Sequence, residues 1–159
     1  MAYRSIAVNE TPANPIVIDK PAGVLAGDIL VAFIIADTPS ANINPWPTDF
    51  VEVTGSPWHA TADNQTLMVA IKVAGGSEGA SYSFPSDFNI IGGIAAFSGC
   101  ASTQPHQVSG AENNSANGSP WAMTSPSFPS NTTVACDMVF IAGSDITSSG
   151  DVVHTGPTG

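Results

Sequence analysis

Proline and glycine recur along the whole 159-residue chain, and their spacing limits what it can fold into. The 13 prolines and 15 glycines leave no uninterrupted amphipathic stretch long enough for a good helix. The short segments between them are rich in β-branched and aromatic residues, which favour strands. The sequence therefore predicts an all-β fold, and in particular an antiparallel β-sandwich of jelly-roll type.

Strands are expected where apolar residues alternate with polar ones or form short unbroken runs. The run at 29–36 is predicted to be buried on both faces, and the segments 66–73 and 80–84 are predicted to form a hairpin. Gly92 and Gly93 predict a bulge, a kink or the close approach of another backbone. The remaining strands are expected at 5–8, 16–19, 50–54, 89–99, 121–124 and 133–143.

The length of the chain suits one domain, predicted to span residues 1–145. Residues 146–159 are polar and rich in glycine and proline, and they are predicted to form a C-terminal tail. Residues 101–130 are rich in Ser, Asn, Pro and Gly, which predicts an exposed excursion and a candidate interaction surface. The N-terminus shows no secretory signal pattern, so we expect synthesis in a cytoplasm.

The charge balance excludes several kinds of partner. Three basic residues face thirteen acidic ones, which gives a net charge of −10, whereas nucleic acids and anionic membrane surfaces require clustered cations. The longest apolar runs, 29–36 and 90–97, fall short of the roughly 20 residues of a spanning helix. We therefore expect neither a nucleic acid nor a membrane as a partner.

Two segments of the chain resemble each other. Residues 21–37 and 129–145 each carry a proline, a spacer of six or seven residues, and an aspartate that opens an apolar run. Two related half-sandwiches would produce this pattern, and so would chance. If the pattern reflects a duplication, the C-terminal half lacks strands, and the resulting unpaired sheet edge would recruit a strand from elsewhere.

Three motifs occur in a characteristic order: KPAGVLAGDILV at 20–31, IKVAGGSEGASYSF at 71–84 and IAAFSGC at 94–100. Together they resemble a β-sandwich module of phage virion proteins. The similarity covers residues 16 to about 145, although Cys136 stands where the module has a second glycine. The resemblance implies a structural protein of the virion, either a capsid decoration (cement) protein or a tail or fibre component, made in the host cytoplasm. Its partners would be other virion proteins and copies of itself, for example in a homotrimer.

Motifs for catalysis are absent from the sequence. There is no GxSxG or SxxK motif and no phosphate-binding loop, and the three histidines lie singly in loop-like segments. Asp19, Asp28, Asp37 and Asp137 flank strands, where capping of turns is the expected role. We therefore predict a protein that is not an enzyme and has no catalytic residues, metal or cofactor. The sequence leaves two alternatives open: a pair of carboxylates brought together only by the fold, as in a glycosidase, and a calcium site assembled from distant loops.

Cys100 and Cys136 lie 36 residues apart, each beside an apolar run and outside any CxxC spacing. Buried thiols are the favoured interpretation, because a cytoplasmic origin disfavours a disulfide. A disulfide stays open if the two flanking strands are neighbours.

Trp46, Trp58 and Trp121 are each next to a proline in loop-like sequence. Such residues can plug the ends of a sandwich, or they can form a platform that stacks on a sugar ring or anchors a protein partner. The alternative function is accordingly a carbohydrate-binding module that recognises a host surface glycan through these residues and the segment 101–130.

Overall fold

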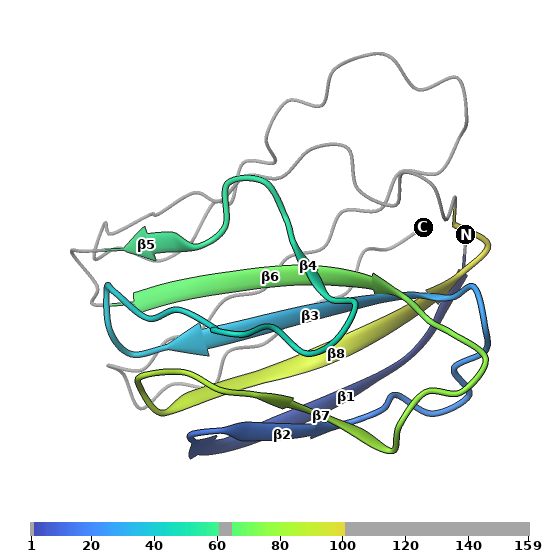
Figure 1. Ribbon diagram of the computed structural model, residues 1–159, viewed down its shortest axis with the longest axis horizontal. Helices are drawn as coiled ribbons and strands as arrows, with labels where there is room; N and C mark the ends of the chain where they lie inside the picture. The colour runs from blue at the N-terminus through green and yellow to red at the C-terminus, as the bar shows by residue number, and fades with distance from the viewer. Residues whose placement is uncertain (1, 61–64, 101–159) are drawn as a thin grey trace, which may run out of the picture.

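The computed structural model describes residues 2–60 and 65–100 of the chain. These residues form eight strands and no helix, so the all-β prediction is confirmed for this part of the protein (Figure 1). The strands are β1 (Ala2–Ala13), β2 (Ile16–Asp19), β3 (Ile29–Ala36), β4 (Val51–Glu52), β5 (Trp58–Ala60), β6 (Gln65–Val73), β7 (Ser81–Phe84) and β8 (Ile90–Ser98).

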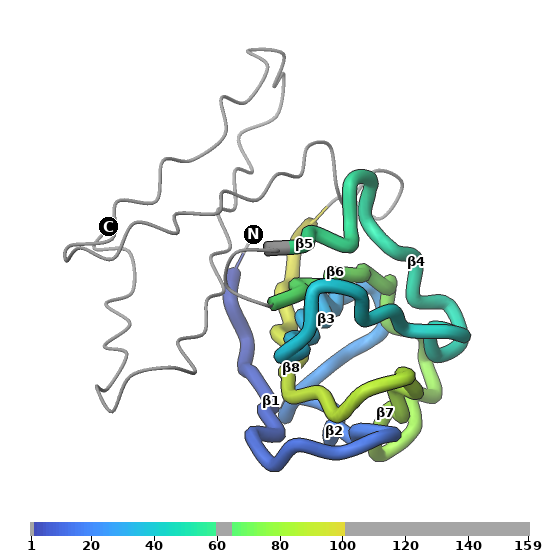
Figure 2. The backbone as a smooth tube through the Cα atoms, turned by 90° about the vertical axis from the view of Figure 1, so that its left-hand side faces the viewer, coloured from blue at the N-terminus to red at the C-terminus, as the bar shows by residue number. Residues whose placement is uncertain are grey.

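Six strands form a large sheet in the order β1-β8-β3-β6-β4, with β5 also paired to β6. Strands β2 and β7 form a separate two-stranded sheet, which lies along one face of the large sheet (Figures 1 and 2). All strand pairs are antiparallel, as predicted. Within the described residues the two sheets do not close on each other, so a complete sandwich or jelly roll stays a prediction.

The main core lies between the two sheets. Every second residue of β3, from Leu30 to Ala36, points toward the small sheet, as the two-residue period of a strand requires. The small sheet contributes four large side chains to the same core, namely Ile16, Ile18, Tyr82 and Phe84. We call the side of the large sheet that meets β2 and β7 the inner face, and the opposite side the outer face.

Strand β3 occupies the centre of the large sheet, between β8 and β6. Six of its eight residues are buried, which confirms the prediction of a strand buried on both faces. Its register with β8 is unbroken, so the irregularity expected near Gly92 and Gly93 occurs only on the other side of β8, where the pairing with β1 shifts between Asn9–Gly92 and Ala13–Ile90. The close approach of another backbone is confirmed as well, because a Cβ atom on Gly92 would lie 2.5 Å from the carbonyl oxygen of Phe33.

The predicted hairpin between residues 66–73 and 80–84 is wrong. Strand β6 pairs with β3, β4 and β5, whereas β7 pairs with β2 in the other sheet. Hydrogen bonds at the two ends of the connecting turn explain this. Ala74 exchanges backbone hydrogen bonds of 2.8 Å with Gly27 and Asp28 beside β3, while the amide of Lys20 donates to the carbonyl of Ala80 beside β2.

Other elements differ from the prediction in length. Strand β1 is longer than the predicted segment 5–8, because an edge strand tolerates polar residues and proline that a central strand rejects. Strand β4 is shorter than the predicted 50–54, and β5 was not predicted. The predicted strands at 121–124 and 133–143, the excursion at 101–130, the domain boundary at 145 and the tail at 146–159 lie outside the described residues.

Candidate functional site

The outer face of the large sheet is apolar across its whole width. Residues that pair directly in neighbouring strands project to the same face, so the register groups the outer residues into four cross-strand rows. The rows are Tyr3-Phe97-Ile29-Val73, Ile6-Ala95-Val31-Ile71-Val51, Val8-Gly93-Phe33-Val69 and Ile91-Ile35-Leu67-Trp58. None of these positions carries a charge. We refer to these four rows as the outer apolar face.

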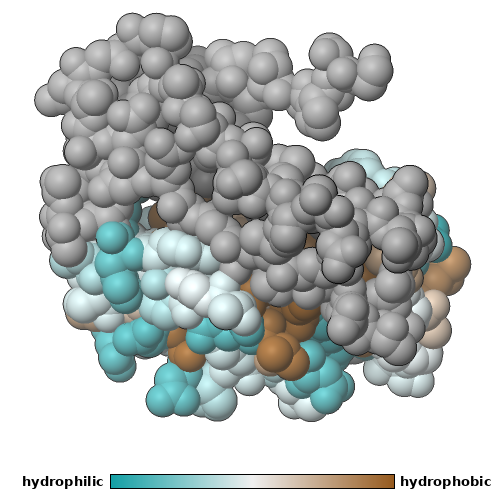
Figure 3. Space-filling view, turned by 90° about the horizontal axis from the view of Figure 1, so that it is seen from above, coloured by the Kyte–Doolittle hydropathy of each residue, from teal (hydrophilic) through white to brown (hydrophobic). Residues whose placement is uncertain are grey.

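Exposure differs between the centre and the rim of this face. At the centre, Ile29, Val31, Ala95 and Phe97 form a second buried cluster, distinct from the main core. At the β1 rim, Tyr3, Ile6 and Val8 are 60%, 46% and 55% exposed, and Val51 on β4 is 66% exposed. Hydrophobic surface is visible in Figure 3, which looks down on the molecule from above Figure 1. Large exposed apolar surfaces on soluble proteins mark interaction sites.

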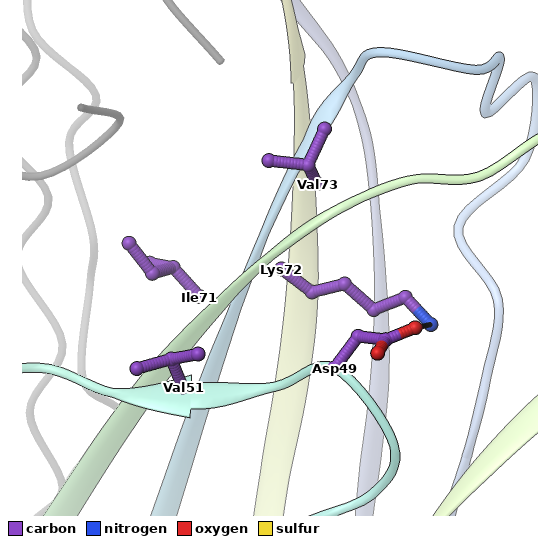
Figure 4. Close-up of a pocket in the computed structure, with 5 residues that line it drawn as sticks. All are labelled: Asp49, Val51, Ile71, Lys72 and Val73. Atoms are coloured by element: carbon purple, nitrogen blue, oxygen red, sulfur yellow. Dashed lines mark ion pairs between the residues drawn. The ribbon is translucent and has the colours of Figure 1, made fainter. Parts of the chain in front are cut away.

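A pocket of about 350 Å³ opens at the β4 side of the outer apolar face. Val51, Ile71 and Val73 line it from the outer face, whereas Lys72 and Asp49 turn to the other side of the strands (Figure 4). The Lys72 ammonium lies 3.7 Å from the Asp49 carboxylate. The pocket therefore offers mainly apolar contact.

Lys72 is held in a buried polar cluster. Its ammonium lies 3.0 Å from a carboxylate oxygen of Glu78 and donates to the carbonyl of Thr48 at 3.2 Å. Glu78 also accepts hydrogen bonds from the Gly75 amide at 2.6 Å and from the Tyr82 hydroxyl at 2.8 Å. Burial raises the pKa of Glu78, but these hydrogen bonds and the Lys72 charge outweigh it, so that its pKa is lowered. The cluster keeps the Glu78 carboxylate charged and holds it against the Lys72 side chain, which fits a structural role.

Asp28 forms a second polar cluster at the start of β3. Its buried carboxylate pairs with Arg4 and accepts a hydrogen bond from the Leu25 amide at 2.8 Å. Gly23 and Gly27 in the same turn have φ angles of 71° and 87°, which favour glycine. The turn-capping role predicted for Asp28 is thus confirmed. The two clusters give the residues of the 20–31 and 71–84 motifs structural roles.

The structure places Trp46 and Trp58 on different faces. The half-buried Trp46 ring packs against the main core, edge-on to Phe84 at a centroid distance of 6.0 Å, and its indole N–H donates to Glu52 at 3.3 Å. Trp58 pairs with Leu67 and therefore belongs by register to the outer apolar face. The two rings form no common platform, and Trp121 lies outside the described residues. Glycan binding stays a prediction.

Metal binding, membrane crossing and disulfide formation are three further properties on which the described residues bear. Between residues 2 and 100, gaps excepted, no three His, Cys, Asp or Glu side chains gather in a way that could hold a metal ion. In the same part of the chain, no helix has the length and apolar character needed to cross a membrane. Cys100 is half-buried and packs against the second cluster on the outer face, while its potential partner Cys136 lies outside the described residues.

Comparisons of the chain with protein-family models, curated proteins and solved structures found no match. The similarity to phage virion modules therefore stays an expectation based on motifs. Sequence reasoning missed the outer apolar face as a site. A signal was present, because a strand predicted to be buried on both faces requires a layer on each side of its sheet.

Proposed function

We propose that the protein is a structural component of a phage virion, either a capsid decoration (cement) protein or a tail or fibre component. It acts through protein–protein contacts of a β-sandwich of jelly-roll type. The observation that supports this proposal is the β1 rim of the outer apolar face, where Tyr3, Ile6 and Val8 are exposed side by side on an edge strand.

An edge strand of this kind suits assembly for two reasons. Its free side presents backbone N–H and C=O groups to which a strand of another subunit can add, and within the described residues β1 pairs only with β8. Its apolar side chains gain free energy when a partner removes them from water. Strand β1 is 12 residues long, with Arg4 and Glu10 as its only charges, so charge offers little protection against pairing. Other virion proteins, or copies of this chain in a trimer, are the partners we propose.

The proposal is tested on purified particles of the phage whose genome encodes the protein. Quantitative mass spectrometry of purified particles should find the protein at a fixed copy number. Replacing Ile6 with aspartate (Ile6→Asp) should lower that copy number at least tenfold, because a charge would have to be buried in the contact. The matched control is Val17→Asp on β2, since Val17 is similarly exposed, at 47%, but points away from the core on the small sheet.

The control should keep the wild-type copy number, and thermal melts should show that both variants fold. Absence of the protein from purified particles would refute the virion assignment. Equal incorporation of Ile6→Asp and wild-type protein would refute the role of the β1 rim.

A further inference from the structure

The centre of the outer apolar face is a covering site without a described occupant. Among the described strands, the contacts outside the paired neighbours of each sheet join β2 to β1 and to β8, and these belong to the inner side. Ile29, Val31, Ala95 and Phe97 nevertheless form a closely packed apolar cluster on the outer side. A sheet that is apolar on both faces is stable in water only when both faces are covered.

We propose that residues 133–143 of this same chain pack as a strand on the outer apolar face and form its second layer. The segment reads TVACDMVFIAG and is among the most apolar stretches after residue 100. This proposal goes beyond virion assembly, because it concerns how one chain completes its own fold.

The course of the chain supports this occupant. Strand β8 ends at Ser98, and the Cys100 side chain packs against the outer cluster, so the chain leaves the large sheet beside this face. The 32 residues from 101 to 132 then separate Cys100 from the proposed strand. At about 3.3 Å per extended residue, a link of that length can reach any point on the face.

The pattern of the segment indicates which side faces the sheet. Val134, Cys136, Met138 and Phe140 form one alternating set that is wholly apolar, whereas the other set contains Asp137. The outer apolar face carries no charge and would bury the first set without an unpaired carboxylate. We therefore place Cys136 and Met138 toward the sheet and Asp137 away from it.

A second copy of the chain is a less favourable occupant of this face. A second copy would lose translational and rotational freedom on binding, and this entropy cost opposes association. A segment of the same chain is present near the face at a high effective concentration and does not lose this freedom on binding. Strand β1, which pairs only with β8 among the described strands, stays available for other subunits.

Disulfide trapping in the full-length protein tests the proposal. In a Cys100→Ser background, Cys136 is the only native thiol, and Val69→Cys adds a second thiol to the outer apolar face. Under mild oxidation, the intramolecular disulfide should form at least tenfold faster than in the control Val17→Cys, whose thiol lies on the small sheet. Non-reducing electrophoresis and peptide mass spectrometry measure the product. Equal rates for the two variants, or disulfides mainly between chains, would overturn the proposal.

A pair of charge substitutions tests which side of the segment 133–143 packs against the sheet. Met138→Asp should increase binding of the dye ANS several-fold, because the buried charge would displace the segment and uncover the sheet. Val139→Asp, one residue further on, should leave dye binding close to that of the wild type. Similar dye binding by the two variants would contradict the assignment. Neither readout depends on phage particles, so a failure here is distinguishable from a failure of the virion proposal.

Discussion

The two faces of the large sheet are both apolar, but they differ in how they are covered. The inner face meets β2 and β7 and packs against large, fully buried side chains such as Phe84, Ile16 and Ile18. The outer face has a small buried cluster at its centre and exposed residues along the β1 rim. Apolar composition alone therefore does not distinguish a core from an interaction surface.

Polar groups mark the more important difference. The inner side is flanked by the Lys72–Glu78–Tyr82 cluster, whose hydrogen bonds and ion pair join the end of β6 to the start of β7. Buried polar networks of this kind require one particular arrangement, since any other leaves a charge unpaired. The four rows of the outer face contain no such group. The inner face is thus committed to one partner, the small sheet, while the outer face can accept an apolar layer of another origin.

Truncation of one side chain on each face gives the largest expected contrast. Phe84→Ala should lower the free energy of unfolding by about 3–5 kcal/mol, because the ring is fully buried and contacts the Trp46 and Phe50 rings. Val8→Ala on the β1 rim should cost below about 0.5 kcal/mol, because Val8 is already 55% exposed. Urea unfolding of the isolated protein measures both. Comparable losses would mean that the rim is part of the core in the isolated protein.

Two adjacent glycines test the packing of the sheet from both sides. An added Cβ at Gly92 would lie 2.5 Å from the backbone oxygen of Phe33, whereas one at Gly93 would lie 2.5 Å from the tip of the Phe33 ring and 2.9 Å from the backbone oxygen of Ala7. Gly92→Ala should therefore lower the free energy of unfolding by about 1–3 kcal/mol. Gly93→Ala should lower it by less, because the backbone that it meets belongs to the edge strand β1, which shifts more easily than the central strand β3.

The control for this pair is Gly76→Ala, in a turn where an added Cβ would meet nothing within 4 Å. It should leave the midpoint of urea unfolding nearly unchanged. If Gly76→Ala were as damaging as Gly92→Ala, the loss would reflect backbone flexibility rather than the close contact.

The strands were more predictable from sequence than their pairing. The apolar run at 29–36 marks β3 to the residue, because a short unbroken run of β-branched residues is a local signal. The turn at 74–80 looks like a hairpin turn locally, and its true role depends on hydrogen bonds to Gly27, Asp28 and Lys20, which are more than 40 residues away in sequence. Pairing is set by such distant contacts, which periodicity does not reveal.

The candidate site was predictable only in part. Burial of β3 on both faces implied a layer on the outer side, but the cross-strand rows depend on the strand order β1-β8-β3-β6-β4. The position of the tryptophans beside prolines predicts either a plug of the core or a binding platform, and the packing of Trp46 against the main core confirms the first for this residue. Lys72 and Glu78 both belong to the 71–84 motif, but their ion pair depends on the turn that brings them together, and the motif alone does not predict it.

The dependence of stability on pH should give the smallest contrast between the faces. Burial and the hydrogen bond to Glu78 raise the pKa of Tyr82 above its ordinary value of 10.0. Above pH 10 the unfolded chain therefore releases a proton that the folded protein keeps, and the free energy of unfolding falls as the pH rises. The lowered pKa of Glu78 affects the free energy of unfolding at acidic pH. Below its ordinary value of 4.5 the unfolded chain binds a proton first, so stability falls as the pH drops.

The chain has two tyrosines, Tyr82 on the inner side and Tyr3 on the outer face, so substituting each in turn shows which one causes the alkaline loss of stability. Tyr82→Phe should cost about 1 kcal/mol at neutral pH through the lost hydrogen bond and should weaken the loss of stability above pH 10. Tyr3→Phe, on the exposed β1 rim, is the matched control and should leave the alkaline loss in place. Urea unfolding at pH 8 and pH 11 measures both variants. Because the polar cluster lies on the inner side, an alkaline loss that followed Tyr3 instead would place the pH-sensitive contacts of the protein on the outer face.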